Sequence, residues 1–214
     1  MKPTIILGAL VLSFALTASP LYAAEPAPAG AMAAAPAAPK LHAAMRSLWQ
    51  GHAETTRDYA MAVKRGDAAA EKKAADAVVA NAKQIADAVG GFYGADAGKK
   101  MLELLAGHWG AVKALTDADK KGDTAASSKA MQDMGANADE IAKFLSGANP
   151  NLTADAVKGL LVTHAGHHAA LIPEIMKGDT AAEAKTWSAM QAHMNTLADA
   201  LSGAIAKQFP AKAT

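Results

Sequence analysis

Residues 161–168 read Leu161-Val162-Thr163-His164-Ala165-Gly166-His167-His168, and they place three of the chain's seven histidines in one predicted helix. His164 and His168 are four positions apart, so they share a helix face. That face is apolar, because Leu161, Leu171 and Ile175 continue it at three- and four-residue spacing. Imidazoles therefore occupy positions where a buried helix seam would normally carry leucine.

The histidine of this seam recurs twice upstream, at a constant interval of 56 residues, as His108 and His52. Other landmarks keep the same interval without gaps. Among them are three Gly-Asp pairs, Gly66-Asp67, Gly122-Asp123 and Gly178-Asp179, and a column formed by Asn81, Asn137 and His193. So many coincidences at one offset predict a threefold internal repeat.

Each predicted repeat consists of a helix, a tight turn and a second helix. The glycine of each Gly-Asp pair suits the left-handed conformation that closes a helix, and the aspartate suits the N-cap of the next one. We therefore expect an all-α fold, a six-helix bundle built from three αα-hairpins.

Residues equally far from a hairpin turn lie at the same height in the bundle. This rule pairs His52 with Asn81, His108 with Asn137 and His164 with His193. One layer should then hold four seam histidines and two asparagines, with His168 one turn closer to the hairpin tip.

Histidines that converge in this way are typical nitrogen ligands for transition metals. We predict a metal site with His52, His108, His164 and His193 as ligands and His168 as an alternate or second-site ligand, and we expect copper or zinc. Two other readings stay open: a b-type haem held by two facing histidines, and a non-catalytic structural or chaperone-like bundle whose polar layer fixes helix register. No catalytic residue is predicted, because the seam lacks the Glu-x-x-His spacing of di-iron bundles.

The N-terminal part of the chain differs in composition from the rest. Residues 1–23 carry a lysine, an apolar run and small residues near Ala23, which predicts a secretory signal peptide and a periplasmic or secreted protein. Residues 24–40 are rich in alanine and proline and are expected to form a flexible linker to a helical domain over residues 41–210.

Composition excludes several classes of partner and site. The chain has no cysteine, which rules out disulfides, thiolate metal sites and covalently attached haem. The formal net charge is +1 and the lysines are scattered, so nucleic-acid binding is not expected. We expect no stable membrane insertion after removal of the signal peptide, because its apolar run is too short to span a bilayer.

Several short motifs resemble a group of small exported bacterial helical proteins of unassigned function. The resemblance covers roughly residues 41–210. It rests on Trp49-x-x-His52, on Leu105-x-x-His108, on the stretch Asn137-Ala138-Asp139-Glu140-Ile141-Ala142-x-Phe144-Leu145-Ser146-x-Ala148-Asn149-Pro150-Asn151, and on Lys207-Gln208-Phe209-Pro210. It implies a helical fold and export, and it assigns no activity.

Overall fold

The computed structural model describes residues 38–213, and these residues form an all-α bundle, as predicted. Its six helices are α1 (Pro39–Arg65), α2 (Ala68–Tyr93), α3 (Ala95–Lys121), α4 (Thr124–Ala148), α5 (Ala154–Lys177) and α6 (Thr180–Gln208). Helix α1 begins two residues before the predicted start of the domain, with a proline in its first turn, a position that proline favours. The predicted signal peptide and most of the predicted linker lie outside the described residues.

All three Gly-Asp pairs form helix–helix turns. Each glycine has a left-handed backbone, with φ of 69° at Gly66, 70° at Gly122 and 76° at Gly178. Each following aspartate caps the next helix by accepting a hydrogen bond from the backbone N–H three residues later, over 3.0 to 3.1 Å. The same local chemistry, recurring every 56 residues, therefore closes the three hairpins.

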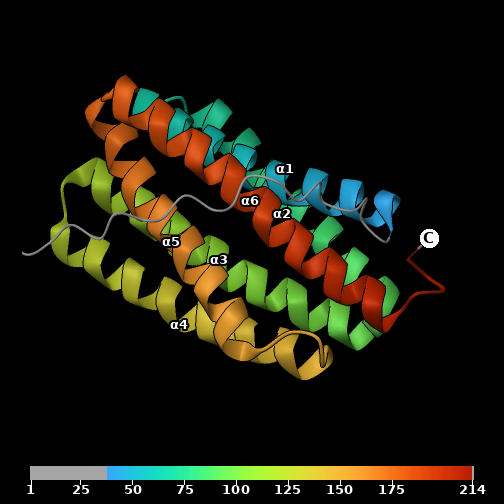
Figure 1. Cartoon of the computed structure of the whole chain (residues 1–214). Helices are drawn as coiled ribbons and strands as arrows, with labels where there is room; N and C mark the ends of the chain where they lie inside the picture. Colours follow the sequence, from blue (N-terminus) through green and yellow to red (C-terminus); the bar gives the residue numbers. More distant parts are fainter. Residues whose placement is uncertain (1–37, 214) are drawn as a thin grey trace, which may run out of the picture. The chain divides into compact units, whose positions relative to one another are not determined.

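The six helices are arranged as a ring around a centre that three of them share. Each helix packs on its neighbours in the chain, and α6 closes the ring by packing along α1 (Figure 1). Helices α1, α3 and α5 also pack on one another, whereas α2, α4 and α6 pack mainly on the helices beside them. The first helix of every hairpin therefore reaches the centre of the bundle, and the second helix covers it from outside.

The buried core is divided along the bundle axis into two large apolar clusters. One cluster includes Trp49, Leu105 and Leu161, and the other, nearer the Gly-Asp turns, includes Val112 and Leu171. His108 and His164 lie in the sequence between the inner-helix members of the two clusters, and His52 directly precedes Ala53, a member of the first cluster. Polar groups at this level of a core need partners, because unpaired buried polar atoms are costly.

Over residues 38–213, none of the helices is both long and apolar enough to cross a membrane.

A candidate metal centre of buried histidines

Three histidines, one from each inner helix, form a nearly equilateral triangle at the centre of the bundle. The ring centroids are 5.7 Å apart for His52 and His108, 5.6 Å for His52 and His164, and 5.4 Å for His108 and His164. The three side chains are 2–6% exposed. The three histidines that recur every 56 residues in the sequence thus lie around one point in the structure.

His168 adds a fourth imidazole to this triangle. It lies one turn along α5 from His164 and is 2% exposed, and its ring centroid is 4.5 Å from that of His164 and 5.8 Å from that of His108. One ring nitrogen from each of His52, His108, His164 and His168 lies within 4.8 Å of the other three. We call these four residues the histidine group. Four ring nitrogens that converge in this way match the number of ligands in a four-coordinate site.

Apolar side chains close one side of the histidine group. Trp49, Leu105 and Leu161 each precede a seam histidine by three residues, so they lie about one turn away on the same helix faces. Together with Ile141 they line, with the three seam histidines, a cavity of about 10 Å³. A space of this size is on the order of one water molecule or one ion. The histidine group therefore borders a space that suits a small, single occupant.

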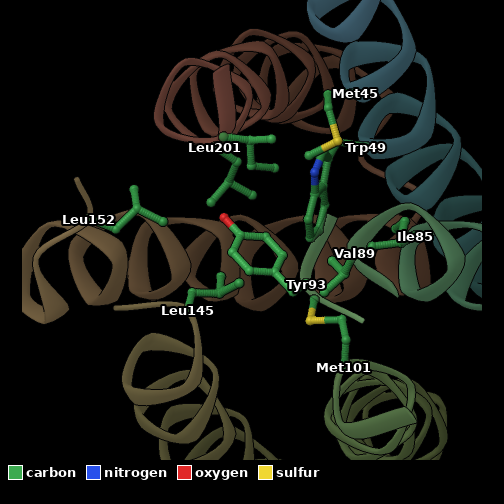
Figure 2. Close-up of a pocket in the computed structure, with 10 residues that line it drawn as sticks. Met45, Trp49, Ile85, Val89, Tyr93, Met101, Leu145, Leu152 and Leu201 are labelled. Atoms are coloured by element: carbon green, nitrogen blue, oxygen red, sulfur yellow. The ribbon is translucent and has the colours of Figure 1, made fainter. Parts of the chain in front are cut away.

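A second, purely apolar cavity of about 20 Å³ lies on the other side of Trp49 (Figure 2). Its walls come from five helices and the α4–α5 link, and they consist of Met45, Trp49, Ile85, Val89, Tyr93, Met101, Leu145, Leu152, Leu201 and Ile205. The indole of Trp49 lines both cavities, and its ring centroid is 5.8 Å from that of His52. Trp49 thus separates the histidine group from the apolar end of the bundle.

Several nitrogens of the histidine group have no hydrogen-bond partner within the described part of the chain. They are Nδ1 of His52, Nε2 of His108 and Nδ1 of His164, and all three are buried. His164 and His168 satisfy one another in part, because their Nε2 atoms are 3.1 Å apart. Leaving a buried polar atom unpaired costs roughly 1–3 kcal/mol. An ion that accepts lone pairs from Nδ1 of His52 and Nε2 of His108 would remove part of that cost.

Burial keeps the histidine group uncharged. Desolvation, assisted by the neighbouring His108, lowers the pKa of His52 to about 3. Desolvation likewise lowers the pKa of His108 to about 4, against a smaller opposing effect of the nearby Asn137 side chain. The pKa values of His164 and His168 lie well below the usual 6.5, first through desolvation and then through the other histidines. Neutral imidazole is the form that ligates metals, so the four side chains are ready to bind at neutral pH.

The structure places His193 outside the histidine group, which differs from the predicted ligand set. Its Nε2 lies 2.9 Å from the carbonyl oxygen of Leu160, and since a carbonyl can only accept, Nε2 donates. Asn81 donates in the same way to Leu48 and Asn137 to Leu104, over 2.9 and 3.0 Å. The height rule correctly pairs the residues across each hairpin, but α2, α4 and α6 are outer helices. Their polar residues reach the backbone of the inner helix instead of the central point.

A glycine makes room for each asparagine. A Cβ atom added at Gly51 would lie 3.2 Å from Nδ2 of Asn81, and one at Gly107 would lie 3.1 Å from Nδ2 of Asn137. The third hairpin has Thr163 at the equivalent position and His193 in place of the asparagine. The first two seams are therefore closed by tight glycine–asparagine packing, and the third is built differently.

Several other polar and methionine side chains have structural roles. His42 lies near Asp199 and Ser202 at the start of α1, with its Nδ1 3.3 Å and 2.9 Å from their side-chain oxygens. Arg57 pairs with the buried carboxylate of Glu183 and also stacks over Trp187. Met134, Met190 and Met194 are fully buried members of the two apolar clusters.

Comparison of the chain with protein-family models, with curated proteins and with solved structures finds no significant match. The resemblance to exported bacterial helical proteins therefore stays a prediction, and the function has to be argued from the histidine group itself.

Proposed function

We propose that this protein binds a transition-metal ion in the centre of its bundle, with His52, His108, His164 and His168 as ligands. The observation that carries the proposal is the convergence of four buried imidazoles, each with a ring nitrogen within 4.8 Å of the others. Three helices that are far apart in the chain contribute to this point. A polar layer needed only for helix register would be expected to pair its own nitrogens, and three of these have no partner among residues 38–213.

Copper and zinc are the metals that we propose. Imidazole nitrogen suits both ions, and four neutral histidines can complete a four-coordinate site without a cysteine thiolate. The expected metal–nitrogen distance of about 2.0–2.1 Å requires the rings to close slightly around the ion. The 3.1 Å between the Nε2 atoms of His164 and His168 is already close to the separation of two ligands on such an ion.

The haem alternative receives less support from the packing. A porphyrin needs a flat space several times larger than the cavity of about 10 Å³ beside the seam histidines. The third and fourth imidazoles, together with Trp49, Leu105 and Leu161, fill the room on either side of any two facing rings. An ion fits this arrangement, and a macrocycle would require the inner helices to separate.

We further propose that the protein is exported and that it sequesters or delivers its metal in the periplasm. Support comes from the lysine, the apolar run and the small residues of residues 1–23, which are typical of a secretory signal peptide. A buried site with neutral ligands suits storage or handover, because the cavity of about 10 Å³ beside it leaves little room for a substrate.

Elemental analysis of protein purified from its native compartment tests the proposal directly. We expect one copper or zinc ion per chain, and we expect its loss when His108 and His168 are both replaced by glutamine. Mass spectrometry of the same sample should give a mature N-terminus near Ala24. Metal-free protein that also fails to take up copper or zinc from solution would refute the metal proposal, and an intact Met1 terminus would refute export.

A further inference from the structure

The third hairpin carries a second pair of histidines beside the histidine group. His167 on α5 and His193 on α6 are both partly exposed, and their ring centroids are 5.4 Å apart. The equivalent positions in the first two hairpins hold Thr55 and Ala111 in place of His167, and asparagines in place of His193. Of the three hairpins, only the third therefore has imidazoles that reach the surface between its two helices.

His193 is held in the way that protein structures commonly hold a metal ligand. Its Nε2 donates a hydrogen bond to the carbonyl oxygen of Leu160, which fixes the ring and its tautomer. The Nδ1 atom is then left with its lone pair free. Metal-ligating histidines typically donate their other ring N–H to a backbone carbonyl or a carboxylate in this manner.

Among the three seams between the helices of a hairpin, the α5–α6 seam is the one that carries imidazoles beside the histidine group. Trp49, Leu105 and Leu161 cover one side, and the cluster that contains Val112 and Leu171 covers the side nearer the turns. The α1–α2 and α3–α4 seams are closed by Gly51 against Asn81 and by Gly107 against Asn137. At the α5–α6 seam, His167 directly precedes His168 in the chain, and His193 is bound to the backbone of α5 at Leu160, four residues before His164.

We propose that His167 and His193 form a transfer site through which a divalent or cuprous ion passes between solvent and the histidine group. The inference rests on the proposed metal function. It concerns the path by which the ion reaches the histidine group, and it leaves the histidine group as the place where the ion is finally bound. An ion held at the pair is presented to the histidine group at an effective concentration on the order of millimolar, far above that of free metal in solution. The pair therefore speeds entry and exit alike and leaves the affinity of the histidine group unchanged.

Metal loading of the whole protein, with copper as the probe, tests this route. Copper near His52 is expected to quench the fluorescence of Trp49, whose ring lies 5.8 Å away, so loading can be followed by stopped flow. In the double variant His167→Gln/His193→Gln we expect loading to slow by about tenfold or more, because the intramolecular step is lost. Removal of copper by a chelator should slow by the same factor, and the equilibrium affinity should stay the same.

Two variants keep the test interpretable. Glutamine at position 193 can still donate to Leu160, and the single variant His167→Gln removes no hydrogen bond to the backbone, so it serves if the double variant folds poorly. His42→Gln, at the start of α1, is the matched control and should load at the wild-type rate. An unchanged rate of copper loading in the histidine-pair variants would overturn the proposed route. A lower affinity for copper in these variants, caused by faster release, would overturn it as well. Wild-type protein that binds no copper overturns the metal proposal itself.

Discussion

The Nε2 atoms of His164 and His168 lie 3.1 Å apart inside the bundle, with both side chains 2–3% exposed. Two neutral imidazoles at this distance share one proton, since one Nε2 must donate and the other accept. A metal ion would take the place of that proton and bind both lone pairs, moving the proton to the opposite ring nitrogen. The two Nε2 atoms can therefore have each other or a metal ion as their partner. Metal binding would replace the hydrogen bond between them with two metal–nitrogen bonds.

Metal should stabilise the folded protein by an amount that grows with the logarithm of its free concentration above the dissociation constant. At a hundred times the dissociation constant, the expected gain is about 2.7 kcal/mol, because only the folded state assembles the ligands. His108→Asn should abolish most of this gain by removing one of four ligands. Thermal melts with and without copper or zinc measure both effects.

His42→Asn provides the control for these melts. His42 is ten residues before His52 on α1, about 15 Å along the helix, so its loss should leave the metal-dependent gain intact. Identical melts of the wild-type protein in the presence and absence of metal would contradict ligation by the histidine group.

Metal binding at pH 7 should release almost no protons. The unperturbed pKa of histidine, about 6.5, would suggest partial proton release and an affinity that weakens as the pH falls through that region. Burial instead lowers the pKa of His52 to about 3 and that of His108 to about 4, so both rings are already neutral. Calorimetric titration in buffers with different ionisation enthalpies should give the same apparent enthalpy. A release of one or more protons per ion would show that the rings are charged before binding.

Much of this site could be predicted because the landmarks in the sequence recur at a constant interval. The interval between His52, His108 and His164 is constant, and the Gly-Asp turns set the height of each residue in its hairpin. Periodicity and turn chemistry are local properties of the chain, so six helices and a histidine layer could be predicted without a structure.

The fourth member of the histidine group could not be predicted in the same way. Height alone assigns His193 to the layer, but which helices occupy the centre depends on how the three hairpins pack together. Because α5 is an inner helix and α6 an outer one, His168 joins the histidine group and His193 binds the backbone of Leu160. The sequence did contain one signal: Asn81, Asn137 and His193 share a column, and asparagine and histidine can both donate to a carbonyl.

Alanine at Gly107 should reveal the glycine–asparagine packing. An added Cβ would lie 3.1 Å from Nδ2 of Asn137, which is bound to the carbonyl oxygen of Leu104. The matched control is Gly110→Ala on the same helix, where the added Cβ meets nothing within 4 Å. The control should gain up to about 1 kcal/mol from helix propensity.

The free energy of unfolding of Gly107→Ala should be lower than that of the control by about 1 kcal/mol or more, because the buried amide of Asn137 is displaced from its partner. Urea unfolding of the two variants measures the difference. Equal stabilisation by both substitutions would show that Asn137 can move aside at no cost.

Acid should destabilise the metal-free protein well before its carboxylates are protonated. The pKa values of all four members of the histidine group are lower in the folded state than the value of about 6.5 expected after unfolding. The unfolded chain therefore binds more protons below that pH, and protonation favours unfolding. The contribution of these residues is fully present above about pH 6.5 and is lost as the pH falls toward the folded-state values.

Each histidine that remains neutral in the folded state should lower the folding equilibrium constant by roughly tenfold for every pH unit below that point. Urea unfolding of the metal-free protein at several pH values between 7 and 4 gives this slope. His108→Asn removes one such group, so its stability should depend on pH less steeply, by about one proton. If the wild type and His108→Asn lose stability with the same slope over this range, His108 is not held neutral by the fold, and the burial argument for the histidine group fails with it.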